Sequence, residues 1–504
     1  MDKSFNLTTQ PWLPVVGSKK VSLLELFEDR MITRISGNPV EKLAIFRLLL
    51  AIAQAAYTPE TEADWEAYSS SDLSTNVLKY LNEKSDCFDL FGDRPFLQVP
   101  QIDVVRQGLE GAKKKPVALI EVLDCEKPTN TKRVVFSGQI PKEEGNDRVA
   151  VLLLIQQAFG KGGKGVDSSI QLSNEFGTVK SAKPGIGLAS IGLLHSHLVA
   201  ETLLETIRLN LLTNQAINET GLFPQGMGVA PWEKVPDSQN CPTAQALKDT
   251  YLGRLVPMGR FCLLVEGGVV VIEGIQHPNY LDGRRDLTVS ADLTGAKTKV
   301  LWSNTNKGPW RELTSILSFL SAKSGSSFEN TQIKLTLGRA RHMGGLIGVW
   351  SGGQKISFKT GEHYMTGLDD YVDSMTWLNV DEIGEPWFIQ LETEMAILDR
   401  IAKIVFICVE KYFLSNGFQK PKKGHLMVAS RASSQYWDKV SNIFFEMIHL
   451  FGDPSEIHTV SKKRRQATHL ANEIYNSFCP RLTARQLQGW AEHKPNFNSI
   501  LRGS

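Results

Sequence analysis

Cysteines are few and scattered in this sequence of 504 residues. Six occur, and no two of them have the C-x-x-C spacing. Closely spaced cysteines staple small secreted domains or bind structural zinc. Their absence argues against a disulfide scaffold and against a zinc site built from cysteines. We therefore expect reduced thiols, as in a cytoplasmic protein.

A strong charge excess is also missing, because 56 basic and 54 acidic residues leave a net charge of +2. A free-standing nucleic-acid-binding domain usually has a larger basic excess. Any contact with nucleic acid must therefore come from local basic patches or be shared with partners. The longest apolar stretches, such as 401–408, are much shorter than the roughly 20 residues that span a bilayer. The segment 1–5 shows no apolar signal-peptide core, so we expect a cytoplasmic protein without a membrane segment.

Familiar catalytic motifs are absent as well. The sequence contains no H-E-x-x-H, no G-x-S-x-G, no His-Asp dipeptide and no helicase box of the DEAD type. The one close histidine pair, His195 and His197, falls on a helix expected over about 195–214, where residues two apart face different sides. Such a pair makes a poor metal site. We predict no enzyme activity, no metal and no cofactor.

The pattern of apolar residues predicts an α+β protein. Segments 260–265 and 269–273 are rich in branched residues and flank a Glu-Gly-Gly turn, which is typical of strands. Beyond about 380, apolar residues follow a 4-3 spacing, as in helices with one buried seam. Two further helices are expected over 456–478 and 482–499. We predict a large mixed domain over 1–380 and a four-helix bundle over 381–504.

Two aromatic segments near the start carry most of the information about the family. The first, Asn6-Leu-Thr-Thr-Gln-Pro-Trp-Leu-Pro-Val15, places Trp12 between two prolines. The second, Phe88-Asp-Leu-Phe-Gly-Asp-Arg-Pro-Phe-Leu-Gln-Val99, surrounds a turn with phenylalanines. Taken alone, both predict packing of aromatic side chains into a core.

Together these segments resemble the start of the CasA family, the large subunit of the type I-E CRISPR surveillance complex, Cascade. That family opens with a similar N-L-x-x-x-P-W-I-P-V strand. An amphipathic helix like 39–57 and an F-x-L…P-F-x-Q stretch follow. Length, order of segments and the C-terminal helices fit along the whole chain.

The resemblance implies a non-catalytic role in antiviral defence. A CasA protein recognises the protospacer-adjacent motif (PAM) in double-stranded DNA, wedges the duplex open to start an R-loop and recruits a helicase-nuclease that degrades the target. The implied partners are the CRISPR guide RNA, the target DNA, the helicase-nuclease and the backbone, small and guide-end-binding subunits of Cascade.

A glycine-lysine loop is the first candidate site: Gly160, Lys161, Gly162, Gly163, Lys164 and Gly165. Its backbone can approach a polyanion closely, and its amides and ammonium groups suit phosphate. It is not a Walker A loop, because Lys164 is followed by Gly165. A flexible solvent loop is the alternative. By resemblance, a loop after Gln156-Gln157 enters the minor groove of the PAM, whose degenerate code suits tolerant recognition.

The second candidate is the segment Gly352, Gly353 and Gln354, which is expected to form a β-turn with one projecting polar side chain. An ordinary hairpin with an exposed glutamine is the alternative. By resemblance to a glutamine-tipped hairpin that follows a Met-Gly-Gly segment, as in 343–345 here, it is the wedge that parts the first base pair. Unstacking costs a few kcal/mol, which guide–target pairing offsets.

The third candidate falls where CasA proteins have a loop that touches the 5′ end of the guide RNA and docks the subunit. Its residues are Asn130, Thr131, Lys132, Arg133 and Phe136. By resemblance, Lys132 and Arg133 contact phosphate and Phe136 anchors the loop. A β-hairpin with a charged tip is the alternative.

A basic run on an expected bundle helix, Lys462, Lys463, Arg464 and Arg465, is a candidate for contacts to a DNA strand. A solvated helix face is the alternative.

One feature departs from the family. Some CasA proteins place a lysine finger in the PAM minor groove just before a strand. Here Glu266-Gly267-Gly268 takes that place. Arg260, or Arg284 with Arg285, are candidate substitutes.

Two other classes of function stay open. The chain could be a nucleotide-binding enzyme of unrecognised fold that uses 160–165. It could also be a purely structural assembly subunit without DNA contact.

Overall fold

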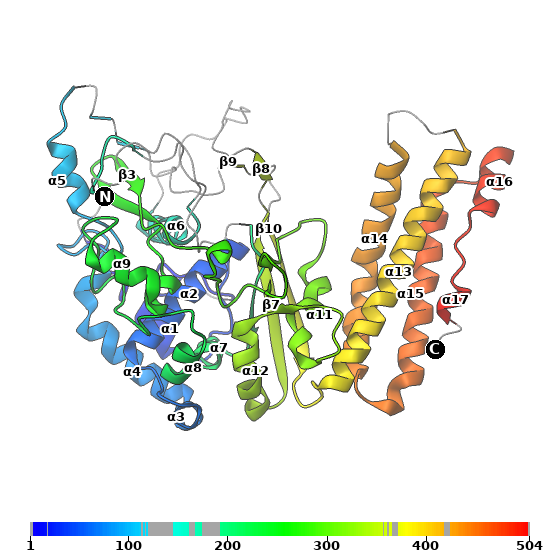
Figure 1. Ribbon diagram of the computed structural model, residues 1–504, viewed down its shortest axis with the longest axis horizontal. Coiled ribbons are helices and arrows are strands. Elements are labelled where there is room, and N and C mark those ends of the chain that lie inside the picture. The colour runs from blue at the N-terminus through cyan, green and yellow to red at the C-terminus, as the bar shows by residue number, and fades with distance from the viewer. Residues whose placement is uncertain are drawn as a thin grey trace. The chain divides into compact units, whose positions relative to one another are not determined.

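The computed structural model shows a mixed protein of helices and small sheets with a C-terminal helical region, which confirms the predicted fold class (Figure 1). It divides into two compact units. Unit 1 comprises Met1–Trp310, Phe328–Met343 and Ile347–Met375, and unit 2 comprises Arg311–Ser327, Gly344–Leu346 and Thr376–Ser504. The structure describes residues 4–17, 19–111, 114–115, 117–118, 145–160, 167–173, 192–355, 357–359, 362–364, 371–417 and 424–501.

Helix α2 (Pro39–Ala56) lies at the centre of unit 1. Asn38 caps it, accepting hydrogen bonds from the amides of Val40 at 3.0 Å and Glu41 at 2.9 Å. Fifteen of its 18 residues are buried, so the helix is not the amphipathic one expected from the resemblance. Its neighbours surround it: α4 (Ser70–Glu83), α6 (Asn146–Phe159), α7 (Leu203–Asn210) and α10 (Tyr251–Leu255).

The two aromatic segments pack into the core of unit 1, as the sequence predicts. Trp12 is fully buried, and its indole N–H donates to the carbonyl of Leu7 at 3.1 Å. The rings of Phe88 and Phe96 stack with centroids 5.4 Å apart, and Trp232 lies against both. Such pairs add about 0.5–1.5 kcal/mol beyond the area they bury.

A three-stranded sheet has the order β1–β7–β10, with β1 at His195–Val199, β7 at Leu346–Gln354 and β10 at Tyr371–Asn379. His195 lies opposite Gly352, and Val199 opposite Gly348, in an antiparallel pair. The helix predicted to start at 195 was therefore wrong. Thr202 caps α7 by accepting from the amide of Glu205, so the residues before it extend and pair as a strand.

The hairpin predicted around Glu-Gly-Gly is confirmed as β2 (Arg260–Val265) and β3 (Gly268–Glu273). Gly267 in its turn has φ +82°, a conformation that favours glycine. A second small sheet places β4 (Ala291–Asp292) between β5 (Lys299–Val300) and β6 (Phe328–Glu329). The remaining described α-helices and strands before residue 385 are α1 (Leu23–Glu28), α3 (Glu62–Ala67), α5 (Gln101–Gln107), α8 (Asn214–Glu219), α9 (Pro242–Asp249), α11 (Leu313–Ile316), α12 (Thr331–Met343), β8 (Ser357–Lys359) and β9 (Glu362–Tyr364).

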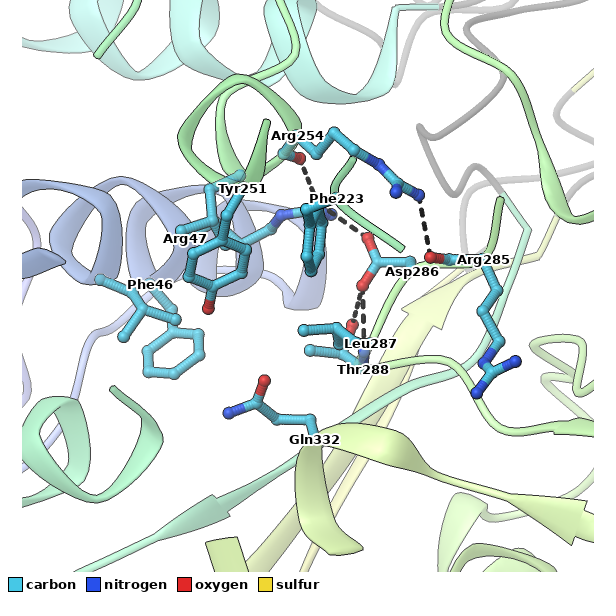
Figure 2. A pocket seen from close by; sticks show the side chains of 12 residues that line it. Phe46, Arg47, Phe223, Tyr251, Arg254, Arg285, Asp286, Leu287, Thr288 and Gln332 are labelled. Atoms are coloured by element: carbon cyan, nitrogen blue, oxygen red, sulfur yellow. Dashed lines mark hydrogen bonds and ion pairs between the residues drawn. The ribbon is translucent and has the colours of Figure 1, made fainter. Parts of the chain in front are cut away.

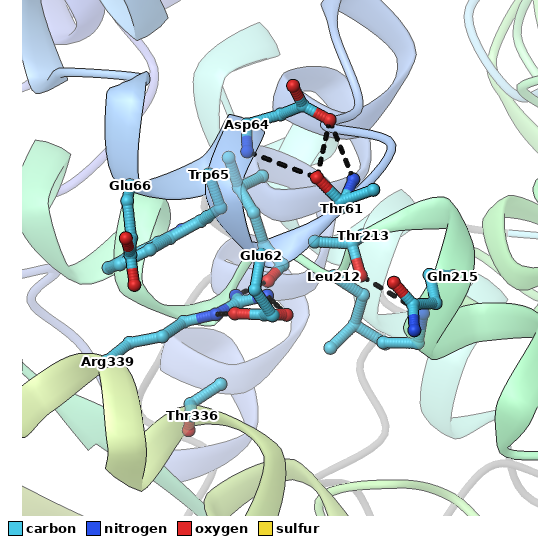
Figure 3. Close-up of polar contacts among 12 residues, drawn as sticks. Thr61, Glu62, Asp64, Trp65, Glu66, Leu212, Thr213, Gln215, Thr336 and Arg339 are labelled. Carbon is cyan, nitrogen blue, oxygen red and sulfur yellow. Dashed lines mark hydrogen bonds and ion pairs between the residues drawn. The ribbon is translucent and has the colours of Figure 1, made fainter.

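A charged aromatic cluster joins α3, α7 and α12, and Figure 3 shows the part formed by Glu62, Trp65 and Arg339. Arg339 donates from Nε and Nη2 to the carboxylate of Glu62 at 2.7 Å and 2.6 Å. The guanidinium groups of Arg208 and Arg339 lie 4.1 Å and 4.7 Å from the ring centroid of Trp65. Cation–π contacts of this kind fix three helices that are distant in sequence.

A buried ion pair links α2 to the segment before β4 (Figure 2). Arg47 Nη2 lies 2.8 Å from Asp286 Oδ2, and the side chains are only 5% and 8% exposed. The other carboxylate oxygen of Asp286 accepts from the amide and hydroxyl of Thr288 at 3.0 Å and 2.8 Å. Burial alone would raise the pKa of Asp286. The charges of Arg47 and His195 and the Thr288 hydrogen bonds outweigh it, and the pKa falls to about 2.

Unit 2 is built on α13 (Glu385–Ser415), α14 (Gly424–Met447) and α15 (Ile457–Phe478), which pack side by side (Figure 1). The predicted seam is confirmed on α13, where Leu391, Leu398 and Val405 are fully buried. The stretch 482–499 forms two short helices, α16 (Ala484–Glu492) and α17 (Asn498–Leu501), in place of one. Pro495 between them cannot continue a helix.

An internal ion pair fixes α15 against α13. The guanidinium of Arg464 donates to both carboxylate oxygens of Glu394, and both residues are buried. Breaking such a pair by removing one partner typically costs about 3–5 kcal/mol, whereas replacing both partners with apolar residues is often neutral.

In the described parts of the chain, no helix is long and apolar enough to cross a membrane.

The Arg47–Asp286 pair generates a stability prediction. Asp286→Ala leaves a buried guanidinium without its carboxylate, so we expect the free energy of unfolding to fall by about 3–5 kcal/mol in urea titrations. The matched control is Glu83→Ala, which removes an exposed ion pair with Lys79 and should cost less than about 1 kcal/mol.

The same pair should make stability depend on acid pH. The folded-state pKa of Asp286 lies below its unfolded value, so its contribution is present above about pH 4 and is lost as the pH falls toward 2. The loss is about 2 kcal/mol in the wild type. Asp286→Asn should lack that component, and an unchanged pH dependence in this variant would contradict the assignment.

Candidate nucleic-acid interface

The start of the predicted glycine loop is packed tightly against β2. Helix α6 ends at Phe159, and the amide of its C-cap residue, Gly160, donates to the carbonyl of Gln156 at 3.1 Å. A Cβ added at Gly160 would lie 2.7 Å from Arg260 Cγ and 2.7 Å from that carbonyl oxygen. The absence of a side chain at Gly160 therefore permits close packing. Its φ of −52° is accessible to any residue, so the backbone conformation does not require glycine. The other loop residues, Lys161 to Gly165, lie outside the described residues.

The glutamine before this loop is a structural anchor. Gln157 is fully buried, and its Nε2 donates to the carbonyl of Leu97 at 2.9 Å. The backbone carbonyl of Gln157 accepts a hydrogen bond from the amide of Gly259 at 3.0 Å. These bonds tie the end of α6 both to the second aromatic segment and to the residue before β2. The chain therefore enters the glycine-lysine segment from a fixed point.

The candidate substitutes for the lysine finger are all engaged in ion pairs. Arg260 is only 3% exposed and lies 3.0 Å from the carboxylate of Glu273. Arg284 lies 3.5 Å from Asp249. Arg285 lies 3.8 Å from Glu329, and its side chain is 17% exposed. The structure thus gives no support to Arg260 as a finger, because extracting it would leave a carboxylate without its partner and a cavity.

The expected turn at 352–354 was wrong. Gly352, Gly353 and Gln354 are the last residues of β7, and Gln354 is 2% exposed. A Cβ on Gly352 would lie 2.7 Å from the Trp350 ring, and one on Gly353 would overlap Ser303. Glycine occurs in turns, but it also occurs within strands where neighbouring atoms approach closely. The second case applies here, and the turn prediction therefore failed.

A two-stranded pair lies further along the chain. Strands β8 and β9 pair antiparallel, with Ser357 opposite Tyr364 and Lys359 opposite Glu362. Their connection, residues 360–361, lies outside the described residues.

The four basic residues of the run on α15 point to different sides of the helix, because successive residues of a helix face different directions. Lys462 and Arg465 are exposed, whereas Arg464 is 8% exposed and paired with Glu394. Lys463 forms an ion pair with Glu446 of α14. The prediction that Arg464 contacts DNA is therefore wrong, because its charge is already neutralised inside unit 2. The guide-RNA candidates Asn130, Thr131, Lys132, Arg133 and Phe136 lie outside the described residues.

The two close histidines lie on β1, not on a helix, so they share one face of a strand. His197 stacks on Phe46 with ring centroids 4.0 Å apart, and burial lowers its pKa to about 3. The His195 ring lies 2.7 Å from the Thr288 hydroxyl. Both are core residues. Among the described residues, no group of three or more His, Cys, Asp or Glu side chains could hold a metal ion.

A small cavity of about 20 Å³ lies beside the Arg47–Asp286 pair (Figure 2). Its lining includes the buried hydroxyl of Tyr251, which has no hydrogen-bond partner within the part of the chain that the structure describes. A volume above roughly 10–15 Å³ accommodates one water molecule. This space suits a structural water and is far too small for a nucleotide.

Comparison with known protein families places the chain in a CRISPR-associated class of proteins. The family model of CRISPR-associated protein Cse1 matches residues 6–474, and the chain belongs to this family. No curated protein matches the chain.

Several solved structures share the fold. CasA from Thermus thermophilus superposes with a TM-score of 0.74 at 19% identity, over 99% of this chain and 100% of that one. Cse1 from Thermobifida fusca gives 0.73 at 17% identity, over 99% and 98% of the two chains. A chain of a CRISPR RNA-guided surveillance complex gives 0.67 at 15% identity, over 99% of each. The resemblance inferred from the two aromatic segments is thereby confirmed.

The packing at the end of α6 gives a further prediction. In Gly160→Ala the new methyl must displace Arg260, so we expect a loss of about 1–3 kcal/mol in the free energy of unfolding. Gly338→Ala is the matched control, because a Cβ there meets nothing within 4 Å and lies within α12. That change should stabilise the protein by roughly 0.5–1 kcal/mol. Equal effects of both changes in urea titrations would contradict the packing argument.

Proposed function

We propose that this chain is the large, non-catalytic subunit of a cytoplasmic type I-E CRISPR surveillance complex. In that role it recognises the PAM in double-stranded DNA, opens the duplex to start an R-loop and recruits the helicase-nuclease. Membership of the Cse1 family supports the assignment to such a complex. The near-neutral charge also fits, because a searching subunit should not bind arbitrary DNA tightly.

The observation that carries the proposal is the anchoring of α6. Buried hydrogen bonds of Gln157 and the contact of Gly160 with Arg260 hold the point from which 161–165 departs. A glycine-rich main chain can enter a narrow minor groove, and Lys161 and Lys164 can neutralise flanking phosphates. Minor-groove readout is degenerate, which suits a motif that tolerates variation.

The wedge belongs, in this proposal, to the β8–β9 hairpin and not to Gln354. Gln354 is held inside β7, so inserting it into a duplex would require the strand to come apart. The paired strands β8 and β9 follow directly and form a narrow two-stranded element. Parting one base step costs a few kcal/mol, which the RNA–DNA pairing beyond it offsets.

Further contacts would come from Lys462 and Arg465, which lie exposed on α15 and can bind backbone phosphates of a DNA strand. The segment that contains Asn130, Thr131, Lys132, Arg133 and Phe136 would contact the guide RNA and dock the subunit. The guide RNA would supply sequence specificity by pairing.

The proposal predicts that motif recognition depends on this chain. A guide-loaded complex would be prepared without the chain, with the wild type, and with Lys161→Ala/Lys164→Ala, and then tested on duplexes with randomised flanks. We expect motif-dependent binding only with the wild type. The double variant should bind more weakly, with a salt slope lower by about 0.9 for each lost phosphate contact.

The control is Lys79→Ala/Lys439→Ala, which removes two exposed lysines, one on α4 and one on α14. If the chain joins the complex and adds no motif dependence, it is a structural subunit. If it does not join at all, the assignment fails, and retention on a nucleotide resin becomes the next test.

A further inference from the structure

A second surface of unit 1, separate from the glycine loop, has the chemistry of a nucleobase site. The loop between β4 and β5, together with Trp302 and with Tyr280 of the single-turn helix η5 (Tyr280–Asp282), lines an open hollow of about 670 Å³. Trp302 and Tyr280 form its aromatic side, with ring centroids 6.4 Å apart and planes at 84°. A volume of this size is typical of small-ligand sites.

The aromatic side is held rigidly. Tyr280 packs against the apolar cluster of Leu193, Val289, Ala291 and Val300. The backbone on both sides of Trp302 is hydrogen-bonded to the segment before β1. The amide of Ser303 donates to Gly192 at 2.8 Å, and Leu301 accepts from the amide of Leu194 at 2.9 Å. Little ordering entropy is therefore lost when a ligand stacks there.

Trp302 is nevertheless 41% exposed, which is unusual for a side chain whose backbone is so firmly fixed. A tryptophan held at the rim of a hollow presents an aromatic surface to a planar ligand. Stacking of one base on such a ring is worth about 1–3 kcal/mol by alanine substitution, and every base has a suitable face.

The lining of the hollow is also cationic. Lys297 and Lys299 line it, and no Asp or Glu is among the described residues that do. From Leu293 to Trp310 the sequence has three lysines and no acidic residue. Lys299 lies 3.8 Å from Asp292, but its side chain is 71% exposed, so this ion pair is weak and leaves the ammonium accessible to phosphate.

We propose that this Trp302 hollow binds an extended single-stranded nucleic acid, with one base on Trp302 and the adjoining phosphates at Lys297 and Lys299. A duplex does not fit this chemistry, because its base faces are already stacked on one another. The inference rests on one part of the proposed function, namely that the chain binds nucleic acid. It adds a single-strand site that is distinct from recognition of the duplex motif.

The test measures fluorescence anisotropy of labelled eight-nucleotide oligothymidine and oligouridine with the 504-residue chain. We expect Trp302→Ala to weaken binding by about tenfold. Trp302→Phe should stay within about threefold of the wild type, whereas Trp302→Leu, which is apolar without a π-face, should resemble Trp302→Ala. Circular dichroism checks that each variant is folded, and Trp302→Leu replaces Trp302→Ala if that variant is not.

The lysines supply a second readout. Lys297→Ala/Lys299→Ala should lower the slope of log affinity against log salt by about 0.7 for each lost contact with a single strand. Lys79→Ala, an exposed lysine on α4, is the control and should behave as the wild type. Tighter binding of one oligonucleotide identifies DNA or RNA as the ligand, and either result supports the site.

The proposal is overturned if the wild type binds neither oligonucleotide, or if Trp302→Ala and Trp302→Leu bind as the wild type does. The same variants would be tested for joining the guide-loaded complex. A chain that joins the complex but shows no Trp302-dependent binding contradicts this inference alone. A loss of joining by Trp302→Ala with unchanged oligonucleotide binding assigns the hollow to a protein partner and also overturns it.

Discussion

The burial of α2 is the constraint on which unit 1 depends. A helix apolar on nearly all sides must be surrounded, so α4, α6, α7 and α10 are drawn around it from distant parts of the sequence. Within that apolar setting lies the charge of Arg47, which Asp286 neutralises directly. The pair fixes how the segment before β4 meets the helix, because an unpaired guanidinium there would be strongly unfavourable.

Two candidate recognition surfaces of unit 1 are held by its packed interior. The glycine segment departs from α6, which packs directly on α2 and is tied to Leu97 by Gln157. Trp302 is held through the backbone of 192–194, which leads into β1. Recognition surfaces in proteins are commonly loops on a rigid scaffold, since precision comes from the scaffold and variation from the loops. The arrangement here follows that principle.

Predictions from the sequence were correct where the apolar periodicity was strong. They failed where a glycine or a charged residue is compatible with two different structural roles. The seam of α13 and the β2–β3 hairpin were predictable, because apolar spacing and a Gly-Gly turn each indicate one structure. Gly352 and Gly353 suggested a turn, yet they permit close packing inside β7. Arg464 belonged to a basic run, yet the helical period turns it inward onto Glu394, 70 residues away. No local pattern shows such a partner. No sequence pattern indicated the hollow at Trp302 either, because Tyr280 and the residues around Trp302 are brought together only by the tertiary structure.

The most direct test of this account is a structure of the guide-loaded complex containing this chain and a target duplex, determined by electron microscopy. The account predicts that residues 161–165 contact the minor groove beside the target. It also predicts that strands β8 and β9 lie at the first opened base pair, with Gln354 still buried at the end of β7. A duplex bound on another surface, or Gln354 extracted from β7 and inserted between bases, would contradict it.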